Sequence, residues 1–515
     1  MRKRIHNNAA NVKGFALPSD AGIKPTQADL ARMTPRRDDA QSGGLHRIPE
    51  DVDMHPAVRS ERVALTSESY LERQAAIESN ARSYPKRLPI VLKSGAGVIV
   101  KDVEGREYID CLAGAGSLPL GHSHPVTVDA IRRALDDGVV LQTLDLPTPL
   151  KERFISELFD SLPAGFSKNY KIHFCGPSGA DAVEAALKLV RVATGRKGVM
   201  AFRGAYHGMT QGALGVSGEI HPKLAACAGE GQFLPFPSDY RCPFGVGGAE
   251  GANLCADYIE GLLDDPNSGV SKPAGIILEA LQGEGGVNPA PNDWLRRIGD
   301  ITRRRGIPLI VDEVQTGLGR TGRLYAIEHA ELTPDVLVLS KAIGGGLPLA
   351  VVIYRRELDV WKSGTHAGTF RGNQLAFASG AAAIRHIVDE HLECRAAELG
   401  ERLQSALKVV AKSHSCIGHV RGRGLMVGAE IIDADAHIKT GRTPSPDRTR
   451  ARAIQDECLN RGLIIELGGR EGSVARFLPP LIVTDTQIDE IAGRFCEAVT
   501  TAEARHADSR AAIAQ

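Results

Sequence analysis

The sequence lacks the features that would commit it to a membrane, a nucleic acid or a disulfide-linked fold. No apolar run approaches the roughly 20 residues that a membrane-spanning helix needs. The 62 basic and 62 acidic residues cancel, so no excess charge favours nucleic acid or an anionic membrane surface as a partner. The nine cysteines are scattered without a CxxC pair, which argues against a zinc site and favours reduced thiols in the cytoplasm.

The N-terminal segment, residues 1–62, has little that could form a core. It begins with basic residues, but no apolar stretch follows them as a secretory signal would require. Acidic residues such as Asp20 and Asp29 argue against an organelle transit peptide, and Phe15 is the segment's sole aromatic residue. We expect this segment to be disordered or to lie on the surface, because it can bury little apolar area.

Beyond about Val63 the sequence has the periodicity of ordered structure. "SYLERQAAIESNARSYP" has helical spacing, and we expect this helix to end near Pro85. From about Lys171 to Val352, short apolar runs such as "KIHFCG", "PLIVDEV" and "VLVLSKA" alternate with helical segments. That alternation predicts right-handed βαβ units and a mostly parallel sheet covered on both faces.

The segment beyond about Ala378 differs, because long helices are followed by mixed strands and a closing helix. This pattern predicts a separate small α+β domain. The chain is accordingly expected to divide into an N-terminal extension (1–62), a segment that contributes to the small domain (63–140), a large domain (141–378), the small domain itself (379–500) and a tail (501–515).

Residues that could carry chemistry follow the predicted strands. Asp312 and Glu313 end one apolar run, Lys341 ends another, and Tyr206 with His207 follows a third. Ligands of open α/β sheets collect beyond the carboxyl ends of the strands. A buried lysine is costly unless it is paired or used chemically. Taken singly, each residue could still be structural: a capping aspartate, a lysine whose stem lies along apolar surface, or a core aromatic.

The stretch "KIHFCGPSGADAVEAALKLV" predicts a strand, a turn and a helix that opens near Ala180. Such a turn leaves free N–H groups at the positive end of a helix, where phosphate binds, although an ordinary strand-to-helix connection would look alike. A lysine amine can form a Schiff base with an aldehyde, and a carboxylate can hold a pyridinium nitrogen protonated. Together these parts predict a site for pyridoxal 5′-phosphate (PLP), with the glycines after Lys341 allowing backbone to approach it.

From about Tyr84 to about Val499 the chain resembles the class III aminotransferases, which are PLP enzymes of fold type I. The resemblance rests on eight motifs in order: "GPSGADAVEAALK", "YHG", "EALQGEGG", "VDEVQTGLGRTG", "LSKAIGGGLP", "HAGTFRGNQ", "VRGRGLM" and "RFLPPL". It implies an α/β fold with a mostly parallel, seven-stranded type of sheet in a large domain, plus a small α+β domain. "CLAGAGSLPLGHSHP", "YHGMTQGAL" and "YRCPFG" are most similar to members that exchange the terminal amino group of L-2,4-diaminobutanoate with 2-oxoglutarate, giving L-aspartate 4-semialdehyde and L-glutamate, or the reverse.

The resemblance implies how the cofactor is held. Lys341 would form the Schiff base and then act as base and acid in the proton transfer. Asp312 would pair with the pyridine nitrogen and Gln315 with the 3-hydroxyl, while Tyr206 would stack on the ring. The phosphate would be bound by the turn residues Ser178, Gly179 and Ala180.

The resemblance also implies how substrates and a second subunit take part. Arg476 would bind the substrate α-carboxylate, and Glu284 would pair with Arg476 when an ω-amino donor must be accepted. Glu279 would support the wall of the site. Thr369 would reach the phosphate of the neighbouring subunit's cofactor, so the active enzyme would be a homodimer with shared active sites.

Three positions depart from the family pattern. Many relatives have an arginine after "HG" for the distal carboxylate of 2-oxoglutarate, but this chain has Met209. Ala180 stands where many have Ser or Thr, and Arg371 where many have Gly. A carboxylate without a partner in a partly dry pocket is costly, so Arg371 is a candidate for binding it. A structural salt bridge of Arg371 at the subunit boundary is an equally good alternative.

Other functions stay open at this point. The donor could be ornithine, 4-aminobutyrate or a polyamine, or the chain could be an aminomutase of the glutamate-1-semialdehyde type or a PLP-binding regulator. The glycines of "GLGRTG" (317–322) match a dinucleotide-binding pattern, which is disfavoured because no acidic-ended strand follows in the expected place. His122 and His124 predict a loop near the substrate rather than a metal pair.

Overall fold

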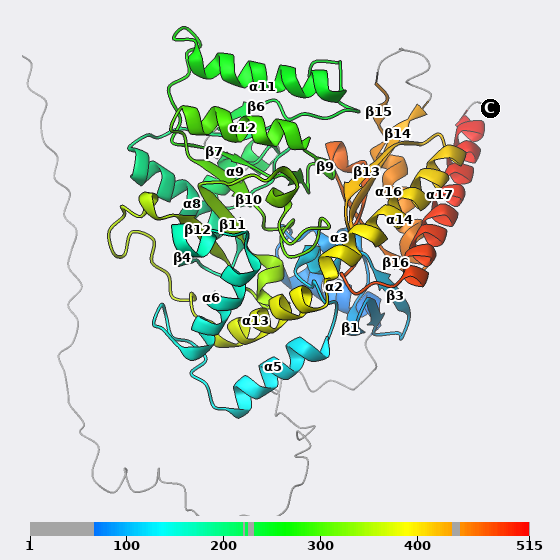
Figure 1. Cartoon of the computed structure of the whole chain (residues 1–515). Helices are drawn as coiled ribbons and strands as arrows, with labels where there is room; N and C mark the ends of the chain where they lie inside the picture. The colour runs from blue at the N-terminus through cyan, green and yellow to red at the C-terminus, as the bar shows by residue number, and fades with distance from the viewer. Residues whose placement is uncertain (1–65, 220–221, 225–230, 435–442, 514–515) are drawn as a thin grey trace, which may run out of the picture. The chain divides into compact units, whose positions relative to one another are not determined.

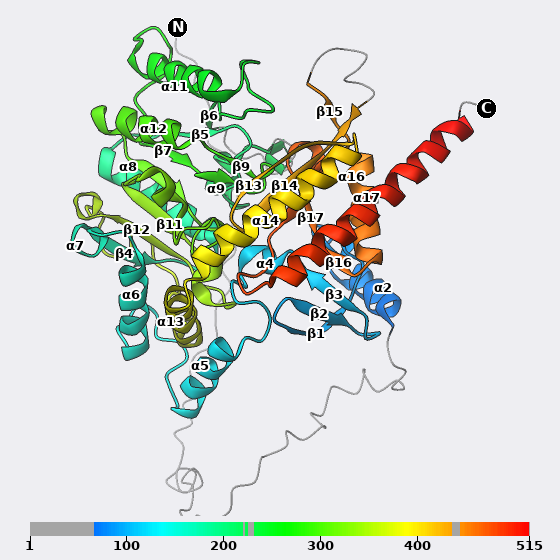
Figure 2. The ribbon, with the colours of Figure 1, turned by 45° about the vertical axis from the view of Figure 1, so that its right-hand side comes forward.

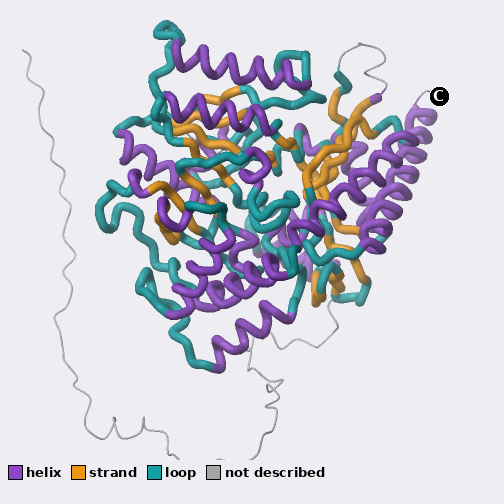
Figure 3. Tube along the Cα trace, viewed as in Figure 1, coloured by secondary structure: helices purple, strands orange, loops and turns teal. Residues whose placement is uncertain are grey.

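The structure, a computed structural model, describes residues 66–219, 222–224, 231–434 and 443–513. The expectations for residues 1–62 lie outside these ranges. Residues 64–515 belong to one unit, and within it helices lie on both sides of the strands (Figure 3). None of the helices in the described ranges is long and apolar enough to cross a membrane.

A seven-stranded sheet occupies the part of the unit that carries most of the predicted site (Figure 1). Its order is β4-β12-β11-β10-β7-β5-β6, and β12 runs antiparallel to both neighbours while the other pairings are parallel. The bounds are β4 Tyr170–Phe174, β5 Val199–Phe202, β6 Gln232–Leu234, β7 Gly275–Leu278, β10 Leu309–Asp312, β11 Val336–Leu339 and β12 Val351–Arg355. The predicted mostly parallel sheet is thus confirmed.

Alternating side chains of these strands enter two different cores. Ile310 of β10 packs in the core that contains α8 (Gly179–Thr194), whereas Leu309 and Val311 pack in the core on the other face. That second face is covered by α6 (Pro149–Ser161), α12 (Asn292–Arg304) and α13 (Gln374–Asp389), with α11 (Gly248–Asp264) lying on α12. Burial on both faces explains why the strands read as continuous apolar runs.

Two smaller sheets lie in the unit, and one of them joins the N-terminal strands to the C-terminal part of the chain (Figure 2). In the first, β3 pairs in parallel with β16, and Leu463 lies opposite Ile109. This sheet comprises β1 Leu92–Ala96, β2 Ile99–Asp102, β3 Glu107–Asp110 and β16 Leu463–Ile464. The second comprises β13 Ile417–Arg423, β14 Met426–Asp433, β15 Ser445–Pro446, β17 Glu466–Gly468 and β18 Val474–Phe477.

The helices beside the small sheets are α14 (Leu392–Ser413), α16 (Arg448–Asn460) and α17 (Asp485–Ile513). α17 lies against both α14 and α16, and it runs across the boundary predicted at residue 500. The remaining short elements are α4 Ala113–Gly116, α5 Pro125–Asp136, α7 Phe166–Asn169, α9 Gln211–Gly215, β8 Leu281–Gln282, β9 Asn288–Pro289, η2 Ala326–Ala330, η3 Lys341–Gly344, η4 Arg356–Leu358 and η5 Arg470–Gly472.

The helix end predicted near Pro85 is wrong. α2 (Ser67–Ile77) is capped by the Thr66 hydroxyl and ends well before the proline. Pro85 instead lies in the first turn of a second short helix, α3 (Tyr84–Arg87). A proline is tolerated there because the N–H groups of the first turn have no partner within the helix.

Candidate active site

Lys341 begins η3 directly after β11, with a positive φ of 50°. Burial lowers the pKa of its amine, and Glu284 and Asp312 oppose that shift. A lowered pKa increases the share of neutral amine, which is the nucleophilic form. The close approach that Gly345 permits is to α13, since a Cβ there would lie 2.6 Å from Ser379 Oγ. That contact accounts for this glycine without the approach to a cofactor that the sequence suggested.

Asp312 ends β10 and is paired with a histidine. Its Oδ2 lies 2.8 Å from Nδ1 of His207, and its Oδ1 accepts a hydrogen bond from the Val314 N–H at 3.0 Å. Both side chains are buried, and Nε2 of His207 has no hydrogen-bond partner among the described residues. The sequence placed His207 beside Tyr206 but gave it no role; its place next to a predicted site residue was the available signal.

Glu279 holds the loop of Tyr206 against the segment that leads to Glu284. Its carboxylate accepts hydrogen bonds from the N–H groups of Tyr206 at 3.0 Å and Gly283 at 2.9 Å. Burial raises the pKa of Glu279 to about 7. Gln315 reaches the same segment, because a Cβ on Gly283 would lie 2.0 Å from its Oε1, while its Nε2 donates to the Ala115 carbonyl at 3.1 Å.

The predicted phosphate turn lies at the start of α8. Ser178 caps this helix, and its hydroxyl accepts a hydrogen bond from the Asp181 N–H at 3.2 Å. The N–H groups of Gly179 and Ala180, at the first two helical positions, have no acceptor within the helix and lie at its positive end. A Cβ on Gly179 would lie 2.9 Å from Val314, and one on Gly208 would lie 2.5 Å from Ala180. The turn therefore touches the segments that follow Asp312 and Tyr206.

Arg476 on β18 is completely buried between two carboxylates. Its Nη1 lies 2.8 Å from Oε1 of Glu284, and its Nη2 lies 2.8 Å from Oε2 of Glu284 and from Oε2 of Glu466. Glu466 is fixed further by a hydrogen bond from the Tyr84 hydroxyl. The Glu284 side chain is 26% exposed and that of Glu466 is 5% exposed. Sequence reasoning missed Glu466, although a glutamate within the apolar run "LIIELGG" is expected to have a buried partner.

A cavity of about 880 Å³ opens beside these residues. Its lining includes Tyr206, seven arginines and four glutamates, one of which is Glu284. Met209, where many relatives carry the arginine for the distal carboxylate, is 55% exposed and lies outside the lining. Arg371 lies outside it as well. A pocket of this size and charge suits a small anionic substrate.

Arg371 is buried elsewhere, beside β4 and α8. Burial lowers the pKa of His173 to about 4 and a hydrogen bond from His366 lowers that of Asp181, and the nearby charge of Arg371 adds to both shifts. Its Nε and one Nη have no hydrogen-bond partner among the described residues. Thr369 is exposed in the same loop, and its carbonyl accepts a hydrogen bond from Gln142.

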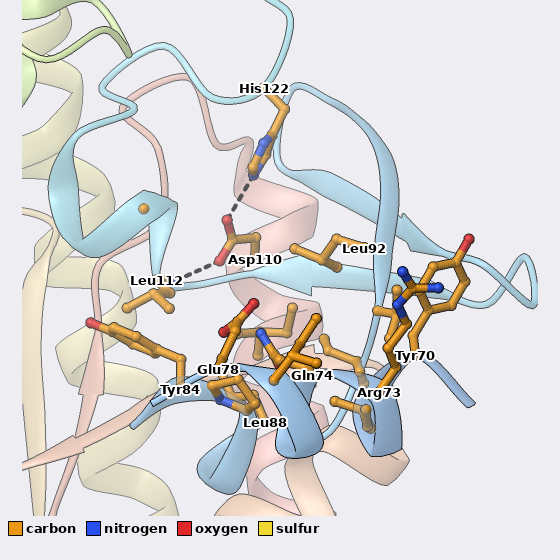
Figure 4. Close-up of a pocket in the computed structure, with 17 residues that line it drawn as sticks. Tyr70, Arg73, Gln74, Glu78, Tyr84, Leu88, Leu92, Asp110, Leu112 and His122 are labelled. Atoms are coloured by element: carbon orange, nitrogen blue, oxygen red, sulfur yellow. Dashed lines mark hydrogen bonds and ion pairs between the residues drawn. The ribbon is translucent and has the colours of Figure 1, made fainter. Parts of the chain in front are cut away.

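A second, mostly apolar cavity of about 580 Å³ lies between α2 and the strands β1 and β3 (Figure 4). Two of its lining residues are hydrogen-bonded to each other, with His122 Nε2 lying 2.8 Å from Asp110 Oδ2. Tyr84 lines the same cavity. His124 packs against the ring of His386 rather than beside His122. No group of three or more His, Cys, Asp or Glu in the described part of the chain could hold a metal ion.

A dinucleotide-binding site at the glycines of residues 317–322 would require a helix that begins directly after them. Residues 314–325 form turns and bends after β10, so no helix N-terminus faces a phosphate there. Glu313 stabilises this segment, because it accepts hydrogen bonds from the N–H groups of Ala326 and Ile327 at 3.0 and 2.8 Å. Gly322 allows close contact with Ala397 of α14. These glycines are therefore accounted for by packing.

Comparison with known proteins gives a consistent result. The family model described as "Aminotransferase class-III" matches residues 80–499. The chain is 54% identical over 433 residues to the diaminobutyrate–2-oxoglutarate aminotransferase of Rhizobium meliloti (strain 1021), covering 83% of this chain and 92% of that protein. It is 48% identical to the Haemophilus influenzae protein of the same name, covering 85% and 97%. The ornithine aminotransferase of Toxoplasma gondii, solved with partial occupancy of PLP at its active site, has a TM-score of 0.70 at 29% identity and covers 86% of this chain and 96% of its own.

Proposed function

The chain belongs to the class III aminotransferases, and from that membership we propose that it transfers the terminal amino group of L-2,4-diaminobutanoate to 2-oxoglutarate with the help of PLP. The products are L-aspartate 4-semialdehyde and L-glutamate, and the reverse reaction supplies diaminobutanoate. Relatives of that name at 54% and 48% identity support this choice over the other ω-amino donors.

The observation that carries the proposal is the pairing of Arg476 with Glu284. The carbon that loses the terminal amine of diaminobutanoate bears no carboxylate, so it fits a site in which the arginine is already neutralised. The reacting carbon of glutamate does bear one, and this carboxylate can take the place of Glu284. Glu284 can move because its side chain lines the cavity and is partly exposed.

The residues present fit PLP. Ser178, Gly179 and Ala180 offer a hydroxyl and free N–H groups to its phosphate. The buried Asp312, oriented by His207, would hold a proton on the pyridine nitrogen. When bound, PLP supplies an electron sink for the carbon that carries the transferred amine. Gln315 would hydrogen-bond the ring hydroxyl and Tyr206 would cover the ring, while the Lys341 amine would hold the aldehyde and serve as the base and acid at the reacting carbon.

We further propose that the enzyme is a homodimer with shared sites. Large apolar side chains are exposed on two segments that pair through Gln142 and Asn373: Val140, Leu141, Leu144, Leu146 and Phe370. Contiguous exposed apolar surface is typical of an interface. Thr369 lies in this region, as its role at the neighbouring subunit's phosphate requires. Arg371 fits the structural alternative better than the carboxylate role, because it is buried near His173 of β4 and Asp181 of α8.

A cytoplasmic location belongs to the same proposal. It is supported by the eight cysteines in the described part of the chain, all of which are free thiols. Free thiols are typical of proteins kept in a reducing compartment.

A donor panel tests the function. Purified holoenzyme with 2-oxoglutarate is given L-2,4-diaminobutanoate, L-ornithine, 4-aminobutanoate or putrescine, and glutamate formation is followed. We expect the highest kcat/KM for L-2,4-diaminobutanoate. A higher value for another donor would replace the substrate, and amino transfer within one molecule without any 2-oxo acid would make the protein an aminomutase.

A further inference from the structure

The two substrates of the proposed reaction have the same number of bonds between one carboxylate and the carbon that reacts, and the site must recognise this spacing. In L-2,4-diaminobutanoate the carboxylate carbon is three bonds from the carbon that reacts. In 2-oxoglutarate the distal carboxylate carbon is also three bonds from the carbon that reacts. One cationic group at a fixed distance from Lys341 can therefore serve both half-reactions, whereas Arg476 is needed for the additional α-carboxylate of glutamate and 2-oxoglutarate alone.

The cavity beside Tyr206 and Glu284 contains cations without counter-ions. Of its arginines, Arg241 and Arg421 share the carboxylate of Glu430, and Arg452 is paired with Asp456 at 2.9 Å. Arg203, Arg448 and Arg470 also line the cavity, and none of the three forms an ion pair with another residue in the described ranges. Burial lowers the pKa of Arg470, the nearby charges of Arg241 and Arg203 lower it further, and the charge of Glu430 opposes that shift. Arg203 and Arg470 are both exposed to the cavity's solvent, and a guanidinium group that has no carboxylate partner is suited to binding an anion.

Glycine contacts place both arginines next to Glu284. The Gly469 N–H donates to the Glu284 carbonyl at 2.7 Å, which fixes Arg470 one residue further along. A Cβ on Gly285 would lie 2.3 Å from the Gly204 carbonyl oxygen, which brings Arg203 to the same turn. A larger residue at Gly285 would prevent the approach to Gly204. The approach of Gly469 to Glu284 depends on its positive φ of 73°, which glycine adopts readily.

The turn that carries Arg470 is strained. Glu471 has a φ of 57°, in the left-handed region that side chains other than glycine rarely adopt, and it is flanked by Gly469 and Gly472 at 73° and 70°. Such strain persists where the surrounding structure over-determines the backbone, which is common at ligand-binding turns. Arg470, in this turn, lines the cavity.

We propose that Arg470 and Arg203 form the subsite for the carboxylate three bonds from the reacting carbon, in both the amino donor and 2-oxoglutarate. This inference rests on the proposed function. The pair supplies the positive charge that Met209 does not. It also explains selectivity: ornithine places its carboxylate one bond further away, and a polyamine has no carboxylate to bind.

The test compares substrates that differ by that carboxylate. 1,3-Diaminopropane is L-2,4-diaminobutanoate without its carboxylate, and 2-oxobutanoate is 2-oxoglutarate without its distal one. Loss of a hydrogen-bonded charge is expected to reduce kcat/KM by at least roughly tenfold. We therefore expect Arg470→Gln and Arg203→Gln to lower kcat/KM by that factor for the two carboxylate-bearing substrates, with 1,3-diaminopropane and 2-oxobutanoate nearly unaffected. Arg470→Lys should restore part of the difference.

Arg452→Gln is the matched control, because Arg452 lines the same cavity but already has a partner in Asp456. Equal losses on both members of each pair would show a structural role for Arg470 and overturn the subsite, as would unchanged kinetics. The acceptor pair is measured with whichever donor the wild type uses. Failure of diaminobutanoate as a donor would therefore refute the proposed function while leaving the subsite testable with 2-oxoglutarate.

Discussion

Replacing Glu284 with glutamine distinguishes the roles of Glu284 and Glu466, the two carboxylates that pair with Arg476. In the wild type, the α-carboxylate of 2-oxoglutarate must displace Glu284 from contacts of 2.8 Å before it can bind the guanidinium. A hydrogen bond to a charged group contributes about 1.5–3 kcal/mol. Because Glu284 is 26% exposed, solvent screening places its contribution toward the lower end of that range.

A glutamine competes weakly, so Glu284→Gln should lower KM for 2-oxoglutarate by roughly tenfold, the equivalent of about 1.4 kcal/mol. Glu466 remains paired with Arg476 in this variant, so the buried cation keeps a counter-ion and we expect the fold to be retained. The assay is steady-state kinetics with 2-oxoglutarate varied at several fixed donor concentrations, together with thermal unfolding of each protein.

The matched control is Glu466→Gln, the same chemical change at the other carboxylate. Glu466 is 5% exposed and bonded to Tyr84, so it is not the group that an incoming carboxylate displaces. We expect this control to change KM for 2-oxoglutarate much less and to lower Tm more than Glu284→Gln, because removal of one partner from a buried ion pair is strongly destabilising. If KM is unchanged in Glu284→Gln, or falls equally in both variants, Glu284 is not the mobile partner and the reasoning fails.

Three further predictions concern other parts of the site. Lys341→Ala should abolish transamination and the visible absorbance of bound PLP while the Tm of the apoprotein changes little; wild-type turnover in this variant would contradict the assignment of Lys341. Asp312→Asn should lower kcat on the order of a hundredfold or more, because it removes the charge that holds the pyridine nitrogen protonated, and a loss smaller than roughly tenfold, about 1.4 kcal/mol, would place that role elsewhere. Arg371→Lys should leave KM for 2-oxoglutarate unchanged and weaken the dimer in sedimentation experiments, whereas a selective rise in that KM would return the distal carboxylate to Arg371.

The sequence predicted the parts of the fold that depend on local pattern. Continuous apolar runs identified the parallel strands, and Asp312 and Lys341 lie at the strand ends where this pattern placed them, while their roles stay predictions. The role of Glu466 could not be predicted in this way, because local periodicity does not show that β17 and β18 pair so as to place it opposite Arg476. The error at Pro85 has a different cause: proline is compatible both with the end of a helix and with its first turn, and the sequence does not choose between them.

The pairing of β3 with β16 has a consequence for the order in which this protein can fold. Ile109 must find Leu463, which a ribosome adds some 350 residues later in synthesis. Arg476 and Glu466, which form an ion pair with each other, are also synthesised near the end of the chain. Contacts of such high sequence separation form late and slowly. The large sheet and the pairing of β1, β2 and β3 with one another can therefore form on the growing chain, but the free edge of β3 stays without its partner β16 until translation is almost complete.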